Sequence, residues 1–171
     1  VEKKRVVYSA IGHEEMTVPS GLGVLARFLD EREGIQLSPL PLKEIQAIPP
    51  DAEAVLIAAP QTPFEPREFD VLREYLSRGG SLFIAAMPDS RSDINLFLKD
   101  LGLEVRRGIV LDNYENYRSD RRFLRVQRFA NHEINRGMQN INTTFIDPST
   151  AVVRVVEKPP RHLNVTSLFY A

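Results

Sequence analysis

Short apolar runs recur along the first two-thirds of the chain, and most are separated by segments whose apolar residues return every three or four positions. Five runs have the length and composition of β-strands, and they lie at 6–11, 35–42, 54–59, 81–87 and 103–111. The third contains no polar residue, which is typical of a strand covered on both faces in a parallel sheet. The second contains Pro39 and Pro41, which lack the N–H of a sheet ladder, so we expect it nearer an edge.

The intervening segments have the period of helices. We predict helices over about 19–33 and 66–78, and a third that begins at a Ser92 cap and continues to Leu101. Glycine follows each of them, at Gly34, Gly79 and Gly102, where the chain must leave the helical conformation. The inner stripe of the first helix is expected to contain Leu22, Leu25, Phe28 and Leu29.

Strands that alternate with helices indicate an α/β fold. Five strands joined by right-handed crossovers predict a flavodoxin-like, doubly wound, mostly parallel sheet of order 2-1-3-4-5, with helices on both faces. The pattern weakens after Asp112, where 123–129 and 151–156 predict extra C-terminal strands. We therefore expect one α/β domain over 1–171, with a core at about 4–112 and an extension at about 113–171.

Composition excludes several classes of protein. The 171 residues include 22 Lys and Arg against 23 Asp and Glu, so net charge gives no general attraction to nucleic acid or an anionic membrane. The chain has no Cys, which excludes disulfides, thiolate metal sites and a Cys nucleophile. No apolar run approaches the roughly 20 residues of a membrane span. Because both ends look cut, we expect this chain to be a fragment of a longer protein.

Polar residues at the carboxyl ends of the predicted strands are the first candidates for a site, because ligands of open parallel sheets bind there. The candidates at this edge are His13, Glu14, Gln61, Asp89 and Asp112. His13 with Glu14 and Glu15 can form a general base with its orienting carboxylate, or a set of metal ligands. The simpler interpretation is a turn at Gly12 followed by capping residues, and the pattern favours it.

The C-terminal part contains two further candidates. His132 can face His13 across the fold, or can be a turn histidine bonded to backbone. Five arginines lie close together and are opposed only by Asp120: Arg118, Arg121, Arg122, Arg125 and Arg128. They can form an anion site or a docking strip for acidic lipid or protein. A solvated surface paired with acids elsewhere is the simpler interpretation.

Cofactor motifs are incomplete in this sequence. Gly21 and Gly23 lie near a helix start, but the full Gly-x-Gly-x-x-Gly pattern is missing, and so is the phosphate-loop motif. We therefore expect no nucleotide, no metal and no other cofactor.

Four ordered segments carry a family resemblance: 6–14, with Gly12-His13-Glu14; 48–60; 72–82; and Asn131-His132-Glu133-Ile134. Together they resemble the extracytoplasmic domain of GldG-like (gliding-motility type) ABC-transporter auxiliary proteins, over about residues 4–156. That domain is related to the intraflagellar-transport N-terminal domain. The resemblance implies a fold allied to class I glutamine amidotransferases, whose Cys nucleophile sits on a strand-to-helix elbow with His and Glu partners. Without a Cys, this chain is expected to keep the fold and not the chemistry.

These observations lead to one expected function and two alternatives. We expect a non-enzymatic auxiliary domain of an ABC-type transport system that binds a ligand or protein partner through the strand-end loops. The resemblance implies transporter membrane or ATPase subunits as partners, a periplasmic location, and membrane anchoring through segments outside this chain; nucleic acid is not expected. One alternative is a hydrolase or transferase that uses His13 and Glu14, with Asp112 as a third candidate. The other is a cytosolic scaffold module.

Overall fold

The computed structural model describes residues 4–114, 116, 117, 119–126, 128–138, 141, 143–145, 150–160 and 163–170. The chain forms two compact units. Unit 1 comprises Val1–Ala86 and Ser90–Phe97, and unit 2 comprises Met87–Asp89 and Leu98–Ala171. The single domain expected from the sequence over 1–171 stays a prediction.

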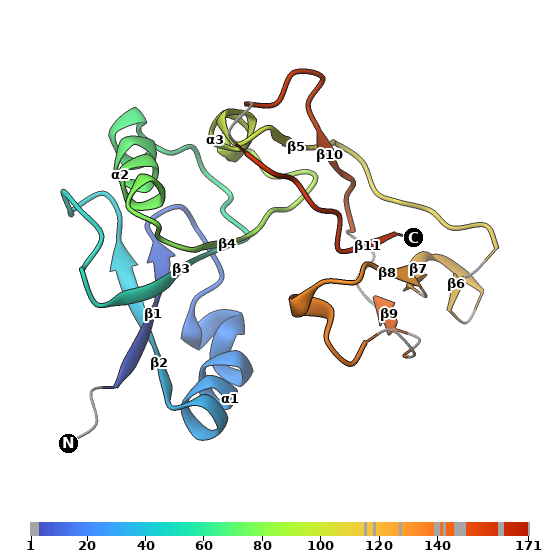
Figure 1. Cartoon of the computed structure of the whole chain (residues 1–171), viewed down its shortest axis with the longest axis horizontal. Helices are drawn as coiled ribbons and strands as arrows, with labels where there is room; N and C mark the ends of the chain where they lie inside the picture. The colour runs from blue at the N-terminus through green and yellow to red at the C-terminus, as the bar shows by residue number, and fades with distance from the viewer. Residues whose placement is uncertain are drawn as a thin grey trace. The chain divides into compact units, whose positions relative to one another are not determined.

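Unit 1 is built on a four-stranded parallel sheet (Figure 1). Its strands are β1 (Arg5–Ile11), β2 (Ile35–Pro41), β3 (Ala52–Ala58) and β4 (Leu82–Ala85). Their order is β2-β1-β3-β4, which confirms the first four positions of the predicted order. β2 lies at an edge, as its two prolines predict.

Two helices lie on opposite faces of this sheet (Figure 1). They are α1 (Gly23–Glu33), preceded by the turn η1 (Val18–Leu22), and α2 (Pro66–Ser77). Opposite faces are required because the crossover from β1 to β2 and that from β3 to β4 run in opposite directions, and both are right-handed. A third helix, α3 (Ile94–Asp100), follows β4.

The first helix begins later than the sequence pattern predicts. Gly21 has φ 152° and Ser20 is also non-helical, so the chain kinks before α1 starts at Gly23. Leu22 is buried against Leu56 and Ala58, but α1 itself contains no buried residue. Leu25 and Phe28, predicted to face the core, are exposed, which corrects the expected inner stripe.

The predicted fifth strand does not extend the parallel sheet. The structure places a three-residue β5 (Leu103–Val105) antiparallel to β10 (Val153–Val155). The backbone N–H of Arg106 donates to Val152 O, and Arg154 pairs with Glu104 at 2.6 Å. Because β10 supplies these partners, β5 forms a separate two-stranded sheet, and the five-stranded order is wrong.

Unit 2 otherwise consists of short antiparallel strands, in agreement with the predicted C-terminal strands. A three-stranded sheet contains β6 (Asn116–Tyr117), β7 (Asp120–Val126) and β9 (Thr143–Phe145), in the order β6-β7-β9. β8 (Arg128–Phe129) pairs with β11 (Phe169–Tyr170), and the short helix η2 covers Glu133–Asn135. Alternate residues of β7, Leu124 and Val126, are buried and form the inner side of that strand.

The core of unit 1 leads directly to the strand-end loops. Buried residues of β3, including Val55 and Ile57, lie in the middle of the sheet. A chain of rings then runs from Phe97 through Phe69 to Phe64, with centroid separations of 5.6 and 5.2 Å. Phe64 lies in the loop before α2, so the apolar core reaches the carboxyl edge of the sheet.

Candidate functional site

The carboxyl ends of β1 and β3 are joined through His13. β1 ends at Ile11, and Gly12, at φ 122°, turns the chain so that the His13 side chain enters the protein. The backbone oxygen of His13 accepts hydrogen bonds from the N–H groups of Gln61, at 2.8 Å, and Thr62, at 3.2 Å. The structure therefore brings together two residues predicted from sequence, His13 and Gln61, through their backbones.

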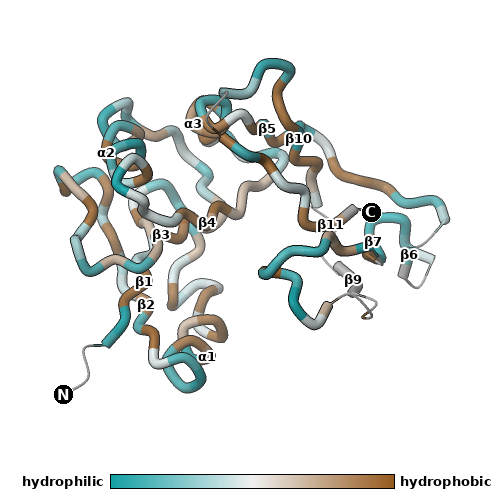
Figure 2. Tube along the Cα trace, viewed as in Figure 1, coloured by the Kyte–Doolittle hydropathy of each residue, from teal (hydrophilic) through white to brown (hydrophobic). Residues whose placement is uncertain are grey.

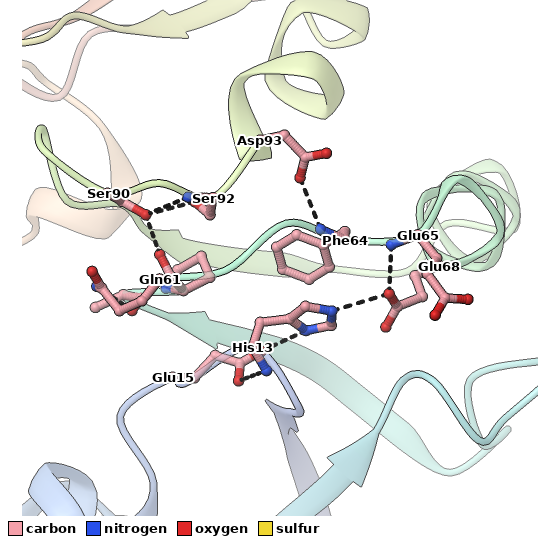
Figure 3. Close-up of polar contacts among 11 residues, drawn as sticks. His13, Glu15, Gln61, Phe64, Glu65, Glu68, Ser90, Ser92 and Asp93 are labelled. Atoms are coloured by element: carbon pink, nitrogen blue, oxygen red, sulfur yellow. Dashed lines mark hydrogen bonds and ion pairs between the residues drawn. The ribbon is translucent and has the colours of Figure 1, made fainter.

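Two carboxylates hold the imidazole of His13 (Figure 3). Nδ1 lies 3.2 Å from Glu15 Oε1, and Nε2 lies 3.0 Å from Glu68 Oε2. His13 is 0% exposed, and both glutamates are buried. Each ring nitrogen therefore faces a carboxyl oxygen, and the two contacts together fix the orientation of the ring.

The glutamates are themselves fixed by backbone. Glu15 Oε2 accepts from His13 N at 2.7 Å, and Glu68 Oε2 accepts from Glu65 N at 2.7 Å. Glu68 Oε1 is buried without a hydrogen-bond partner among the described residues. The cluster therefore links the loop after β1 to the first turn of α2.

Aromatic and polar contacts close the cluster from the other side (Figure 3). The Phe64 ring stacks on His13 at 3.9 Å between centroids and an angle of 22°, so it covers one face of the imidazole. Phe64 N donates to Asp93 Oδ1 at 2.9 Å. The Ser90 hydroxyl donates to Pro60 O and also accepts from Ser92 N. Loops after β1, β3 and β4 are thus tied together within unit 1.

Glu14 takes a different position from the one considered in the sequence. Its φ is 58°, and its side chain is exposed and has no hydrogen bond or ion pair among the described residues. Glu15, one residue later, turns inward to His13. Because Glu14 has a left-handed backbone conformation, its side chain and that of Glu15 point in different directions.

Glu68 was not a candidate from sequence. Its available signal is a capping box: Glu65 at the N-cap and Glu68 at the third helical position bond reciprocally, with Pro66 between them. That signal predicts the contact with Glu65 N. It does not predict the contact with His13, which lies 55 residues away in the chain.

Ala59 is a strained residue at the end of β3. Its φ is 55°, uncommon for a residue with a Cβ, and its N–H donates to Ala85 O at 2.7 Å. A nucleophile elbow also uses a strained residue at a strand end. Here that residue has only a methyl side chain, and it is buried.

The acidic and histidine candidates of unit 2 are engaged locally. Asp112 Oδ1 accepts from Tyr114 N at 2.8 Å, which closes a tight turn. His132 Nδ1 accepts from Ile134 N at 3.2 Å and caps η2, which fits the turn-histidine interpretation. Asp89 is exposed in the loop after β4.

The arginine segment forms a strand, so its charges divide between two sides. Arg122 binds Asp120 at 2.7 Å, and this hydrogen bond, more than its charge alone, lowers the pKa of Asp120 to about 2. Arg121 and Arg125 share the other side of β7, and neither has an ion pair within the described part of the chain. Arg128 is exposed in β8, and Arg118 lies outside the described residues.

The described residues carry no signal of a metal site or of a membrane span. They contain no group of three or more His, Cys, Asp or Glu side chains placed to hold a metal ion. Among the same residues, no helix is long and apolar enough to cross a membrane.

A parallel sheet with a helix on each face, and polar strand-end loops tied through a buried histidine, defines a protein of the α/β class. The chain belongs to the family described as "ABC-type uncharacterized transport system", whose model matches residues 3–154. It is thus an auxiliary component of such a system, and this membership implies that its partners are, in general terms, transporter subunits. This confirms the transport-system part of the resemblance seen in the sequence.

A solved structure titled "mmIFT52 N-terminal domain" has a similar fold. The TM-score is 0.68 with 21% sequence identity, and the match covers 89% of this chain and 69% of that chain. At this identity the likeness supports the fold alone. No curated protein gives a significant sequence match.

Proposed function

We propose that this chain is a non-enzymatic interaction domain of its ABC-type transport system, which contacts a protein partner through the strand-end loops at the carboxyl edge of the parallel sheet and the helix α1 that follows the first of them. The observation that carries this proposal is the closed His13 cluster. A general base needs a free nitrogen within reach of a substrate proton. Both ring nitrogens of His13 face glutamates, and its side chain is wholly buried.

The other groups at this edge support the same proposal. Ala59, in the strained position after β3, offers no nucleophile. The Ser90 hydroxyl donates to a backbone carbonyl, and no described histidine bonds to it as a base would. Both observations support the expectation that this chain keeps the amidotransferase-like fold without its chemistry.

An exposed apolar surface follows directly from the strand-end loop. We call Met16, Val18, Val24 and Phe28 the η1–α1 surface. Val24 is 74% exposed and Phe28 is 55% exposed, although both are large apolar side chains. Val24 and Phe28 are four residues apart in α1 and so share one side of that helix. Exposed apolar side chains on one side of a helix commonly mark protein contacts. Since this surface begins three residues after His13, the cluster can fix the position of the loop that leads to it.

Copurification tests the partner contact. The full-length protein would be tagged and isolated with the transporter subunits encoded beside it, as wild type and as Val24→Glu and Phe28→Glu variants. We expect both substitutions to reduce the recovered subunits at least several-fold, because a buried carboxylate in an apolar contact is costly. The control is Glu31→Lys, which changes an exposed charge of the same helix and should keep the partner. Equal recovery with all variants would contradict this surface.

A screen for ester, amide and glycoside hydrolysis tests the absence of catalysis. We expect no turnover above background. Turnover that disappears in Glu14→Gln would instead support the hydrolase alternative, because Glu14 is exposed and its substitution leaves the fold unchanged.

We also propose an extracytoplasmic location with a membrane anchor supplied by other segments of the protein. The family membership and the resemblance to anchored auxiliary proteins support it. The complete gene should encode an apolar segment of roughly 20 residues. Cell fractionation should place the protein in membranes, and a periplasmic reporter fused to this domain should be active. A protein found wholly in the cytosol would favour the scaffold alternative.

A further inference from the structure

The two edges of the parallel sheet in unit 1 are protected to different degrees. At one edge, β2 contains Pro39 and Pro41, which cannot donate to an additional strand. Proline is one of the common means by which proteins prevent unwanted pairing of edge strands. The opposite edge, β4, has no such residue.

The outward side of β4 has unpaired backbone groups. Ser81 O accepts a hydrogen bond from Val55 N, and Ala85 O accepts one from Ala59 N, just after β3. Residues 81, 83 and 85 therefore point their backbone groups toward β3. The N–H and C=O groups of Leu82 and Ile84 therefore point outward. No described residue forms a strand or loop hydrogen bond with them.

The side chains of β4 also lack the features that block pairing. Residues 81–87 contain no charge and no proline. Figure 2 colours this strand as hydrophobic, and Phe83 is 66% exposed on one face of it. An uncharged apolar strand with open ladder groups is a template for another strand.

A second copy of the same chain can pair with the outward N–H and C=O groups of this edge. We propose that the protein forms a two-fold symmetric dimer by antiparallel pairing of β4 with β4, with Phe83 at the axis and one continuous eight-stranded sheet across both copies. Such self-pairing places β4 opposite the same strand of the second copy. A charged strand would therefore bring like charges together. β4 has no charge to repel its copy.

The hydrogen-bond directions fix the register. Phe83 bonds toward β3, so two Phe83 residues at the axis form a non-hydrogen-bonded pair, with Cα atoms about 4.5 Å apart. Leu82 of each copy then lies opposite Ile84 of the other, and each such pair exchanges two backbone hydrogen bonds. The pairing brings the two exposed aromatic rings side by side on one face of the joined sheet, where each covers part of the other.

Light scattering coupled to gel filtration tests the dimer. The 171-residue chain should have twice the monomer mass, and Phe83→Lys should give the monomer mass with unchanged circular dichroism, because Phe83 is exposed. The matched control is Ile134→Lys, an apolar-to-Lys change at an exposed position of η2, which should remain dimeric. A monomeric wild type, or a dimer that survives Phe83→Lys, would overturn the proposal.

Cross-linking tests the register, because the natural chain has no Cys. Phe83→Cys would place two thiols opposite each other at the axis, and mild oxidation should convert most of it to a covalent dimer. In Ala85→Cys the two thiols would be more than 10 Å apart, by the strand rise of about 3.4 Å per residue, and should stay reduced. Efficient cross-linking of both variants, or of neither, would contradict this axis.

Discussion

His13 combines complete burial with contacts to two carboxyl groups, and the stability of unit 1 should depend on these contacts. A buried polar group is costly unless it has a hydrogen-bond partner, and each ring nitrogen of His13 has one. His13→Ala would leave a cavity and remove this partner from Glu15 and Glu68. We expect a loss of about 3–5 kcal/mol in the free energy of unfolding, measured by urea denaturation.

The matched control for His13→Ala is Glu14→Gln, at the adjacent exposed position. It should change the unfolding free energy by less than about 0.5 kcal/mol. If His13→Ala had as small an effect as this control, His13 would not be the residue that holds the two glutamates.

The carboxyl of Asp120 gives a second test at the residue scale. The hydrogen bond from Arg122 lowers the pKa of Asp120 to about 2. Because the pKa in the folded protein lies below the unfolded value, the pair contributes above a pH of about 3.9 and is lost as the pH falls through about 2. NMR titration should find this low midpoint, and Arg122→Gln should raise it toward the usual value.

Arg121→Gln is the control for the Asp120 titration, because Arg121 is adjacent in sequence but has no ion pair among the described residues. It should leave the midpoint of Asp120 in place. An unchanged titration in Arg122→Gln would show that another group holds the carboxylate ionised.

At the scale of elements, short sequence patterns predicted the helices and strands whose formation depends on neighbouring residues. β1, β3 and α2 were predictable because continuous apolar runs, helical periodicity and Pro66 each specify one structure. The strand that pairs with β5 was not predictable, because an apolar strand can pair with either a parallel or an antiparallel neighbour. Its partner residue Arg154 is 50 residues from Glu104. The contact of Glu68 with His13 has the same long-range character.

The turn between α2 and β4 gives a prediction at this scale. A Cβ on Gly80 would lie 2.5 Å from the ring of Tyr75, whose hydroxyl donates to Ala52 O and whose side chain is buried. Gly80→Ala should therefore cost about 1–3 kcal/mol in chemical denaturation, as overpacking does. In a Tyr75→Leu background the same substitution should cost less, because the two residues are coupled. A strictly additive double variant would contradict this contact.

For the whole molecule, the net charge of −1 conceals an uneven distribution. Unit 1 has 10 Lys and Arg against 14 Asp and Glu, whereas unit 2 has 12 against 9. Composition alone could not reveal this, because the division of the chain into units depends on its contacts. The excess positive charge of unit 2 includes Arg121 and Arg125 on one side of β7.

This asymmetry predicts that the chain binds a negatively charged surface despite its negative net charge. On a cation exchanger at pH 7 and low salt, the chain should be retained, because charges beyond about 10 Å are screened and the local field of unit 2 dominates. The double variant Arg121→Glu/Arg125→Glu should elute at clearly lower salt. Arg27→Glu/Arg32→Glu changes the net charge equally but lies on α1 in unit 1, so it should shift elution less. Equal shifts for the two variants would mean that net charge alone controls the binding, and the arginine side of β7 would then have no special attraction for an acidic partner.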